Sequence, residues 1–157
     1  MDKKQRGLTT LELLIVMAIM AMAGSAGAWQ WHDWQQRHYL LQSATQLRAF
    51  LMKWRDNANW RNTDIHFHVV REGTQWCLTA GPPADGNCRV QSGRIWAAQW
   101  PGIELAEMTD GLGFYGVRNT ARAGRFVLRS QAGEWHIIVS AWGRIRLCQA
   151  GEKQCEL

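Results

Sequence analysis

The chain begins with a short basic segment that is followed by a long apolar run. From Leu8 to Trp29 there are 22 residues, and Glu12 is the only ionisable side chain among them. A run of this length is enough for a helix to cross a bilayer core of about 30 Å. A carboxylate inside such a helix costs about 2.5–3.5 kcal/mol on insertion scales. We therefore predict a membrane-crossing helix in which Glu12 has a functional role.

A helical pattern continues beyond the apolar run. Gly24 and Gly27 weaken the helix locally, since each internal glycine costs about 1 kcal/mol relative to alanine. Apolar residues then recur at steps of four and three, the spacing of one helix face, at Leu40, Ala44, Leu47, Leu51 and Trp54. We expect an amphipathic helix over residues 30–58 that packs against the protein's own sheet. Turn-forming residues predict its end between Asp56 and Trp60.

From residue 64 onward the apolar residues alternate instead. Ile65, Phe67 and Val69 share one face of a predicted strand, and residues 71–74 form a turn into a return strand that begins at Gln75. Further strand-like segments lie at 94–100, 112–115, 125–130, 134–140 and 144–148. Short strands at this spacing predict an antiparallel β-domain over residues 59–157.

The charge distribution suggests an orientation in the membrane. The net charge is +5, and residues 1–7 hold three basic side chains and one acidic side chain. Positive charge before an apolar helix favours a cytoplasmic N-terminus, so the bulk of the chain is expected across the membrane. Three of the ten tryptophans, Trp29, Trp31 and Trp34, follow the apolar run where an interfacial aromatic belt would lie. The mild positive charge does not by itself imply nucleic-acid binding.

Four cysteines lie in the part that we expect to be exported. They allow three pairings, and proximity in sequence favours Cys77 with Cys88 and Cys148 with Cys155. Each short loop would contribute about 2–3 kcal/mol if it is closed without strain. The alternative is a zinc site, but the spacing is not that of a zinc finger and no histidine is close in sequence. An oxidising compartment fits disulfides better.

The start of the chain resembles the signal of type IV pilins and type II secretion pseudopilins. It has a basic segment, Lys3-Lys4-Gln5-Arg6, then Gly7, then Glu12 five positions later. In that family a prepilin peptidase cuts after the glycine, the new first residue is N-methylated, and the glutamate directs assembly. The resemblance therefore implies a leader at 1–7, N-methylation at Leu8 and a transmembrane assembly helix over 8–29. Leu8 stands where the family usually has phenylalanine.

Two other interpretations of this segment are possible. Ala26-Gly27-Ala28 has the form of a secretory cleavage site, but a secretory signal should be uncharged at the position of Glu12. A plain membrane anchor explains the apolar run but not the spacing of Gly7 and Glu12. In the pilin interpretation, the amine exposed by cleavage pairs with Glu12 of a neighbouring subunit, so that the charge is compensated on assembly.

The rest of the chain resembles the H-type minor pseudopilins and their minor-pilin counterparts. The resemblance lies in residues 112–128 with Gly116 and Gly124, in residues 137–148, and in the tryptophan-rich 54–60. It implies an α+β pilin-like fold, with a long N-terminal helix packed on two small antiparallel sheets. It also implies a single-pass inner-membrane protein with a periplasmic domain, later built into a pilus or pseudopilus. The implied partners are a prepilin peptidase and other minor and major pilins or pseudopilins.

A basic hairpin is predicted near the C-terminus. Arg144 and Arg146 are two apart and share one strand face, and guanidinium groups so placed suit phosphate. Three further arginines can lie nearby: Arg122, Arg125 and Arg129. Some minor pilins used in DNA uptake carry a G-R-x-R element here that contacts DNA, and residues 143–146 match it. The alternatives are a solvated face with its aliphatic stems on the sheet, or a subunit contact.

Motifs for catalysis are missing from the sequence. Ser140 lies in no G-x-S-x-G elbow, and neither H-E-x-x-H nor a phosphate-binding glycine loop occurs. His66 and His68 share a strand face but have no third ligand close in sequence. We therefore expect no enzymatic activity, no cofactor and no metal site.

Overall fold

The computed structural model describes residues 9–73, 75–82, 88, 93–152 and 155, without the side chains of residues 25–29. Contacts divide the chain into two compact units, Met1–Gln35 (unit 1) and Gln36–Leu157 (unit 2). The helix α1 (Thr10–Arg61) begins in unit 1 and ends in unit 2, and it continues through Gly24 and Gly27 without interruption.

The start of α1 is capped by Thr9. The backbone N–H of Glu12 donates to the Thr9 carbonyl at 3.0 Å and to its side-chain Oγ1 at 3.4 Å. A threonine followed three residues later by a glutamate has the spacing of a capping box, which satisfies amides that lack partners in the first turn. The local sequence therefore determines where α1 begins.

The end of α1 lies one residue beyond the predicted range. Asn62 has a left-handed backbone with φ of 50°, and the N–H of Thr63 donates to the carbonyl of Ala58 at 3.1 Å. This is the Schellman arrangement, in which a residue after the helix turns the chain so that a last-turn carbonyl is satisfied. Asparagine tolerates this conformation better than most residues, so the helix stops at Arg61.

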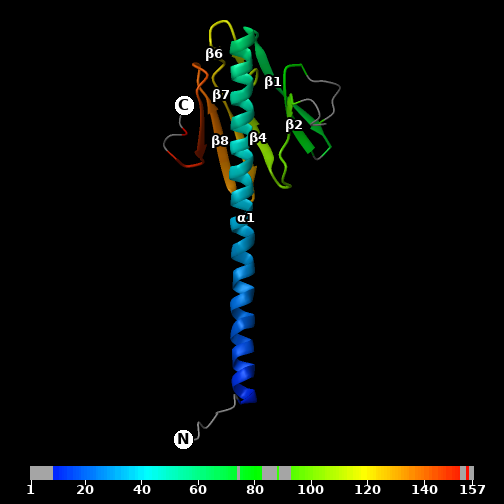
Figure 1. The fold of residues 1–157 in the computed structure, drawn as a ribbon, viewed down its shortest axis with the longest axis vertical. Helices are drawn as coiled ribbons and strands as arrows, with labels where there is room; N and C mark the ends of the chain where they lie inside the picture. The colour runs from blue at the N-terminus through cyan, green and yellow to red at the C-terminus, as the bar shows by residue number, and fades with distance from the viewer. Residues whose placement is uncertain (1–8, 74, 83–87, 89–92, 153–154, 156–157) are drawn as a thin grey trace, which may run out of the picture. The chain divides into compact units, whose positions relative to one another are not determined.

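Unit 2 packs its part of α1 against one face of two antiparallel sheets (Figure 1). The first sheet has the order β3-β2-β1-β5-β6 and the second has the order β4-β7-β8-β9. The bounds of these strands are β1 Ile65–Glu72, β2 Gln75–Ala80, β3 Ile95–Trp96, β4 Glu104–Met108, β5 Gly113–Tyr115, β6 Thr120–Ala121, β7 Gly124–Ser130, β8 Gly133–Val139 and β9 Ile145–Gln149. The predicted α+β class with two small sheets is confirmed.

The core joins the helix to both sheets through Phe67. Its ring centroid lies 6.3 Å from that of Phe50 on α1, 5.6 Å from Phe114 on β5 and 6.4 Å from Phe126 on β7. The helix contributes the face that the sequence spacing predicts, with four residues buried: Leu40, Ala44, Leu47 and Leu51. One apolar layer therefore holds the two sheets together under α1.

Two disulfides fasten loops to strands. Cys77 of β2 pairs with Cys88, with Cα atoms 5.6 Å apart, and Cys148 of β9 pairs with Cys155, at 5.8 Å. These are the two pairs that lie closest in sequence. The side chains of Cys77 and Cys148 are buried, so each bridge connects a described loop residue to the body of unit 2.

The strand pattern differs from the prediction at three places, one of which is the short strand β6, which was not predicted. The segment 94–100 forms only the two-residue strand β3, and the alternation of side chains did not predict β4. In β4 the register against β7 shifts between Leu105 and Glu107, so Ala106 forms a bulge. A bulge places two residues opposite one and interrupts the period of two on which sequence prediction depends.

Candidate functional site

The predicted processing site falls outside the described residues, because Gly7 and Leu8 are not among them. Glu12 is described, and its side chain is exposed in the first turn of α1. A carboxylate at this position interacts favourably with the helix dipole. Glu12 therefore has a local role at the start of its own helix. The spacing Thr9-x-x-Glu12, which is that of a capping box, indicates this role in the sequence.

The described part of unit 1 has an apolar surface around its helix. The large apolar side chains between Leu11 and Met22 are between 42% exposed at Val16 and 74% exposed at Met22. A helix that is apolar all round is normally covered by protein or lipid. Within the described residues, no helix combines the length and the apolarity needed to cross a membrane. The predicted membrane-crossing helix over 8–29 is therefore not confirmed.

The basic hairpin presents its two arginines to solvent. Arg144 and Arg146 are exposed, and Ile145 between them is buried. A tight turn precedes them, because Gly143 N–H donates to the Ser140 carbonyl at 2.9 Å and Arg144 N–H donates to Ser140 Oγ at 3.2 Å. Among the described residues, no carboxylate pairs with either guanidinium. The two arginines are therefore available to an anionic partner.

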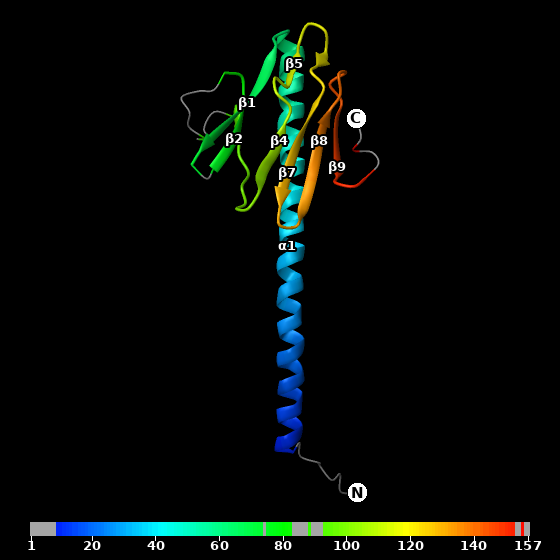
Figure 2. The same ribbon diagram turned by 180° about the vertical axis from the view of Figure 1, so that it is seen from behind.

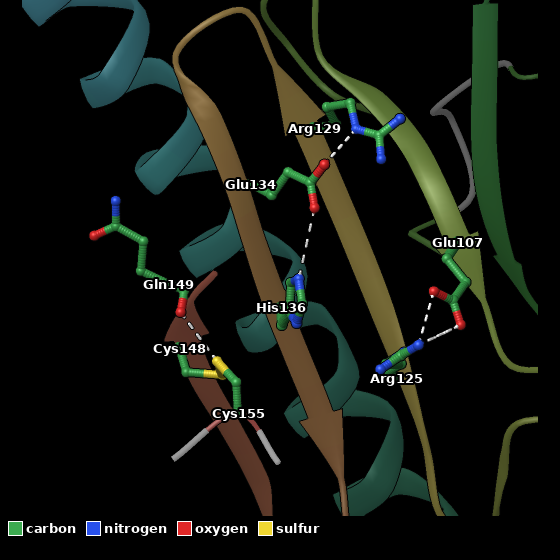
Figure 3. Close-up of polar contacts among 8 residues, drawn as sticks. All are labelled: Glu107, Arg125, Arg129, Glu134, His136, Cys148, Gln149 and Cys155. Carbon is green, nitrogen blue, oxygen red and sulfur yellow. Dashed lines mark hydrogen bonds and ion pairs between the residues drawn. A yellow bond between two sulfur atoms is a disulfide. The ribbon is translucent and has the colours of Figure 1, made fainter. Parts of the chain in front are cut away.

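Two of the three other arginines are already paired with carboxylates. Arg125 forms an ion pair with Glu107 at 3.0 Å, and Arg129 bonds to Glu134 (Figure 3). Arg122 has no ion-pair partner among the described residues, and its side chain lies against Gly111 in the turn that follows β4. The ion pairs thus leave Arg125 and Arg129 without free charge for an anionic partner, because the glutamates come from neighbouring strands that the sequence does not place.

The outer face of the second sheet also supports the alternative in which the arginines pack their aliphatic stems on the sheet. Ile138 lies in register between Arg125 of β7 and Arg146 of β9, and it is only 1% exposed. An apolar residue on an outer sheet face is buried when the aliphatic stems of flanking arginines cover it. Arg146 therefore contributes to packing as well as to surface charge.

Two tryptophans of unit 2 are strongly exposed, one near the end of α1 and one in the turn before the hairpin arginines. Trp60 and Trp142 are 88% and 82% exposed. The segments that carry them are joined, because Arg55 of α1 donates to the carbonyl of Gly143 at 3.4 Å. Large aromatic side chains left in solvent are typical of interaction surfaces. The sequence shows both tryptophans, but only the structure shows that they are exposed.

The two histidines on β1, His66 and His68, are both exposed. The ring of His66 packs edge-on against Tyr115, with centroids 5.9 Å apart. Within the described part of the chain, no three histidine, cysteine, aspartate or glutamate side chains are grouped as metal ligands would be. The hydroxyl of Ser140 is engaged in the β8–β9 turn.

Solved structures share this fold. The type IV minor pilin FimU of Pseudomonas aeruginosa PAO1 aligns over 76% of this chain and 95% of its own, with a TM-score of 0.55 and 19% identity. A second crystal form of FimU aligns over 72% and 95%, with a TM-score of 0.52 and 19% identity. The fold is that of a type IV minor pilin.

The minor pseudopilin EpsH from the type II secretion system of Vibrio cholerae also matches. It aligns over 72% of this chain and 98% of its own, with a TM-score of 0.49 and 16% identity. No protein-family model matches the sequence, and no curated protein matches it. The minor-pilin fold agrees with the architecture expected from the resemblance, a long helix on two small sheets.

Proposed function

We propose that this chain is a minor pilin that assembles with other pilins into a type IV pilus through the first part of α1. The observation that carries the proposal is the exposed apolar surface between Leu11 and Met22, which is interrupted only by Glu12. Such a surface requires a cover of protein or lipid, and a filament core supplies one. As a minor subunit the chain acts in filament initiation or at the tip, as a structural subunit and not as an enzyme.

Assembly is preceded by membrane insertion and processing. The run from Leu8 to Trp29 holds the precursor in the inner membrane, with residues 1–7 in the cytoplasm and unit 2 in the periplasm. Prepilin peptidase then cuts after Gly7, and the amine of Leu8 is methylated. In the filament, this amine pairs with Glu12 of a neighbouring subunit, which compensates a charge that is costly in an apolar setting.

The mass of the mature chain tests this account. Co-expression with a prepilin peptidase should give a product that lacks residues 1–7 and carries one methyl group on Leu8. The Gly7→Leu variant, expressed in the same way, should keep its leader and serves as the control. A mature chain that begins at Trp29 would show an ordinary secretory signal and would overturn the proposal.

A type II secretion pseudopilin is the alternative within the same class, since it would use the same helix. The two are separated by the phenotype of a deletion, because loss of a minor pilin reduces surface pili and loss of a pseudopilin reduces secretion of folded proteins. Normal piliation together with defective secretion would show that the chain is a pseudopilin and not a minor pilin.

DNA binding is a second candidate function, and a specific observation favours it. Arg144 and Arg146 are exposed and unpaired among the described residues, and the exposed Trp142 precedes them in the same turn region. Guanidinium groups bind phosphate, and aromatic rings stack on bases. A DNA-uptake role would use this hairpin while α1 remains in the filament.

A further inference from the structure

The two sheets of unit 2 meet along strand edges that are not paired with each other. β1 pairs with β5 only at Ile65 and His66, and β4 pairs only with β7 among the described strands. Figure 2 shows the two sheets from the side opposite to α1, and residues of β1 and of β4, which belong to different sheets, line one hollow. Among the described residues, the remaining length of β1 therefore has no partner strand on the side of β4.

A groove lies between these two edges. Its volume is about 560 Å³, within the range typical of ligand pockets. It is lined by Phe67, Val69 and Arg71 of β1 and by Leu105, Glu107 and Met108 of β4. A smaller hollow of about 260 Å³ follows at the end where Arg71 and Glu104 lie. We call the two together the β1–β4 groove.

The hydrogen-bonding direction of β1 follows from its pairing with β2. In an antiparallel pair, alternate residues direct their N–H and C=O groups toward the partner strand. The carbonyl of His66 accepts from Gly81 on the β2 side, whereas the N–H of Phe67 donates to Leu112 on the other side. Val69 and Arg71 lie two and four residues after Phe67, so they are directed to the same side of β1 as Phe67. Their N–H and C=O groups therefore point into the groove.

The same reasoning applies to the facing wall. The N–H of Thr109 donates to the carbonyl of Arg125 at 3.0 Å, so Thr109 is directed toward β7. Met108, one residue earlier, directs its N–H and C=O groups away from β7 and into the groove. Both walls thus present backbone donors and acceptors to the groove, regularly along β1 and on either side of the bulge at Ala106 along β4.

The walls are fixed on either side of this opening. At one end, the bond from Phe67 N–H to the Leu112 carbonyl, 3.0 Å long, attaches β1 to the segment that leads from β4 to β5. Toward the other end, the indole N–H of Trp76 donates to the carbonyl of Ile103 at 2.9 Å, which connects β2 to the residue before β4. The apolar contact of Phe67 with Phe126 lies beneath. The groove is therefore a preformed feature of unit 2.

We propose that the β1–β4 groove accepts an extended segment of another polypeptide, which adds a strand to β1 and β4 and joins the two sheets. Only a peptide backbone supplies alternating donors and acceptors to both walls at once. The bound segment carries apolar side chains toward Phe67 and Leu105, alternating with polar side chains that face solvent. Arg71 and Glu104 have no ion-pair partner among the described residues, and they can pair with charges of opposite sign on the bound segment.

Two proline substitutions remove donors from the walls. In Val69→Pro the lost N–H is one that the β1–β2 ladder does not use, so β1 can keep its pairing with β2. Met108→Pro removes a groove-facing N–H from the opposite wall. Val69→Thr and Met108→Leu keep the backbone donor and serve as matched controls. If one proline variant fails to fold, the other still tests the proposal.

The probe is a displayed library of random peptides about ten residues long, the upper range of common strand lengths. The full chain in detergent micelles is the target. We expect enriched peptides with alternating apolar and polar residues, bound about tenfold more weakly by the proline variants and unchanged by the controls. Bound peptide should slow hydrogen exchange at the amides of Val69 and Met108. Failure to enrich such peptides, or binding that survives both prolines, overturns the proposal. Because the groove lies wholly in unit 2, either result leaves filament assembly through α1 open.

Discussion

The backbone amide of Glu12 lies 3.4 Å from the side-chain oxygen of Thr9, to which it donates a hydrogen bond. Glu12 therefore stands at the third position of α1, where a carboxylate also interacts favourably with the helix N-terminus. The proposed assembly contact and the helix cap use the same residue. Experiments on Glu12 have to separate the two roles.

The Glu12→Gln variant makes this separation. Glutamine can still serve in a capping box, but it removes the charge that we expect to pair with a neighbouring amine. We predict strongly reduced incorporation into filaments with membrane insertion intact, since loss of one partner of a buried ion pair costs about 3–5 kcal/mol. The measurement is the amount of the chain in sheared filaments relative to the membrane fraction.

The complementary control is Thr9→Ala, which keeps the charge and removes the cap. Loss of a threonine cap costs about 1 kcal/mol of helix stability, so incorporation should stay close to that of the unmodified chain. If Thr9→Ala blocks incorporation and Glu12→Gln does not, Glu12 acts in helix capping and not in assembly.

Gly116 marks a close approach between the end of α1 and the loop after β5. A Cβ atom at Gly116 would meet the carbonyl oxygen of Ala58 and would lie 2.6 Å from the backbone N of Thr63. Because backbone atoms cannot move aside cheaply, Gly116→Ala should destabilise unit 2 by about 1–3 kcal/mol. Denaturant unfolding measures this loss. Val117→Ala, at an exposed neighbouring position, should change stability by no more than about 0.5 kcal/mol.

The two disulfides should contribute similar stability. Their sequence separations are 11 and 7, so each is expected to add about 2–3 kcal/mol by restricting the unfolded chain. Replacing Cys77 and Cys88 together by serine should therefore lower the unfolding free energy by this amount, as should replacing Cys148 and Cys155. Peptide mapping without reduction should recover the same two pairs, and a crosslink between Cys88 and Cys155 would contradict the structure.

If the basic hairpin binds DNA, the Arg144→Gln/Arg146→Gln variant should bind it more weakly. The dependence of affinity on salt should also become shallower by about two counterions, because each arginine neutralises about one phosphate. Arg125→Gln/Arg129→Gln removes the same charge from arginines that already bond to glutamates, and it should have a smaller effect. Equal losses in both double variants would indicate a general charge effect and not a site at the hairpin.

The features that depend on neighbours in sequence were predictable. The apolar face of α1 follows from the spacing of Leu40, Ala44 and Leu47, and the first hairpin follows from the change to a period of two at Ile65. The disulfide pairs are those between cysteines nearest in sequence. Periodicity and short loops express local physics, so the sequence by itself determined the long helix, the first hairpin and the antiparallel β character of the rest of the chain.

Contacts between distant strands were decided only by the tertiary structure. The carboxylates of Glu107 and Glu134 neutralise Arg125 and Arg129, which the sequence placed with the free arginines of the hairpin. β4 escaped prediction because the bulge at Ala106 breaks the alternation of its side chains. The β1–β4 groove depends on backbone groups left unpaired at two strand edges. Side-chain patterns do not encode which edges remain open, so only the packing of the two sheets on α1 reveals them.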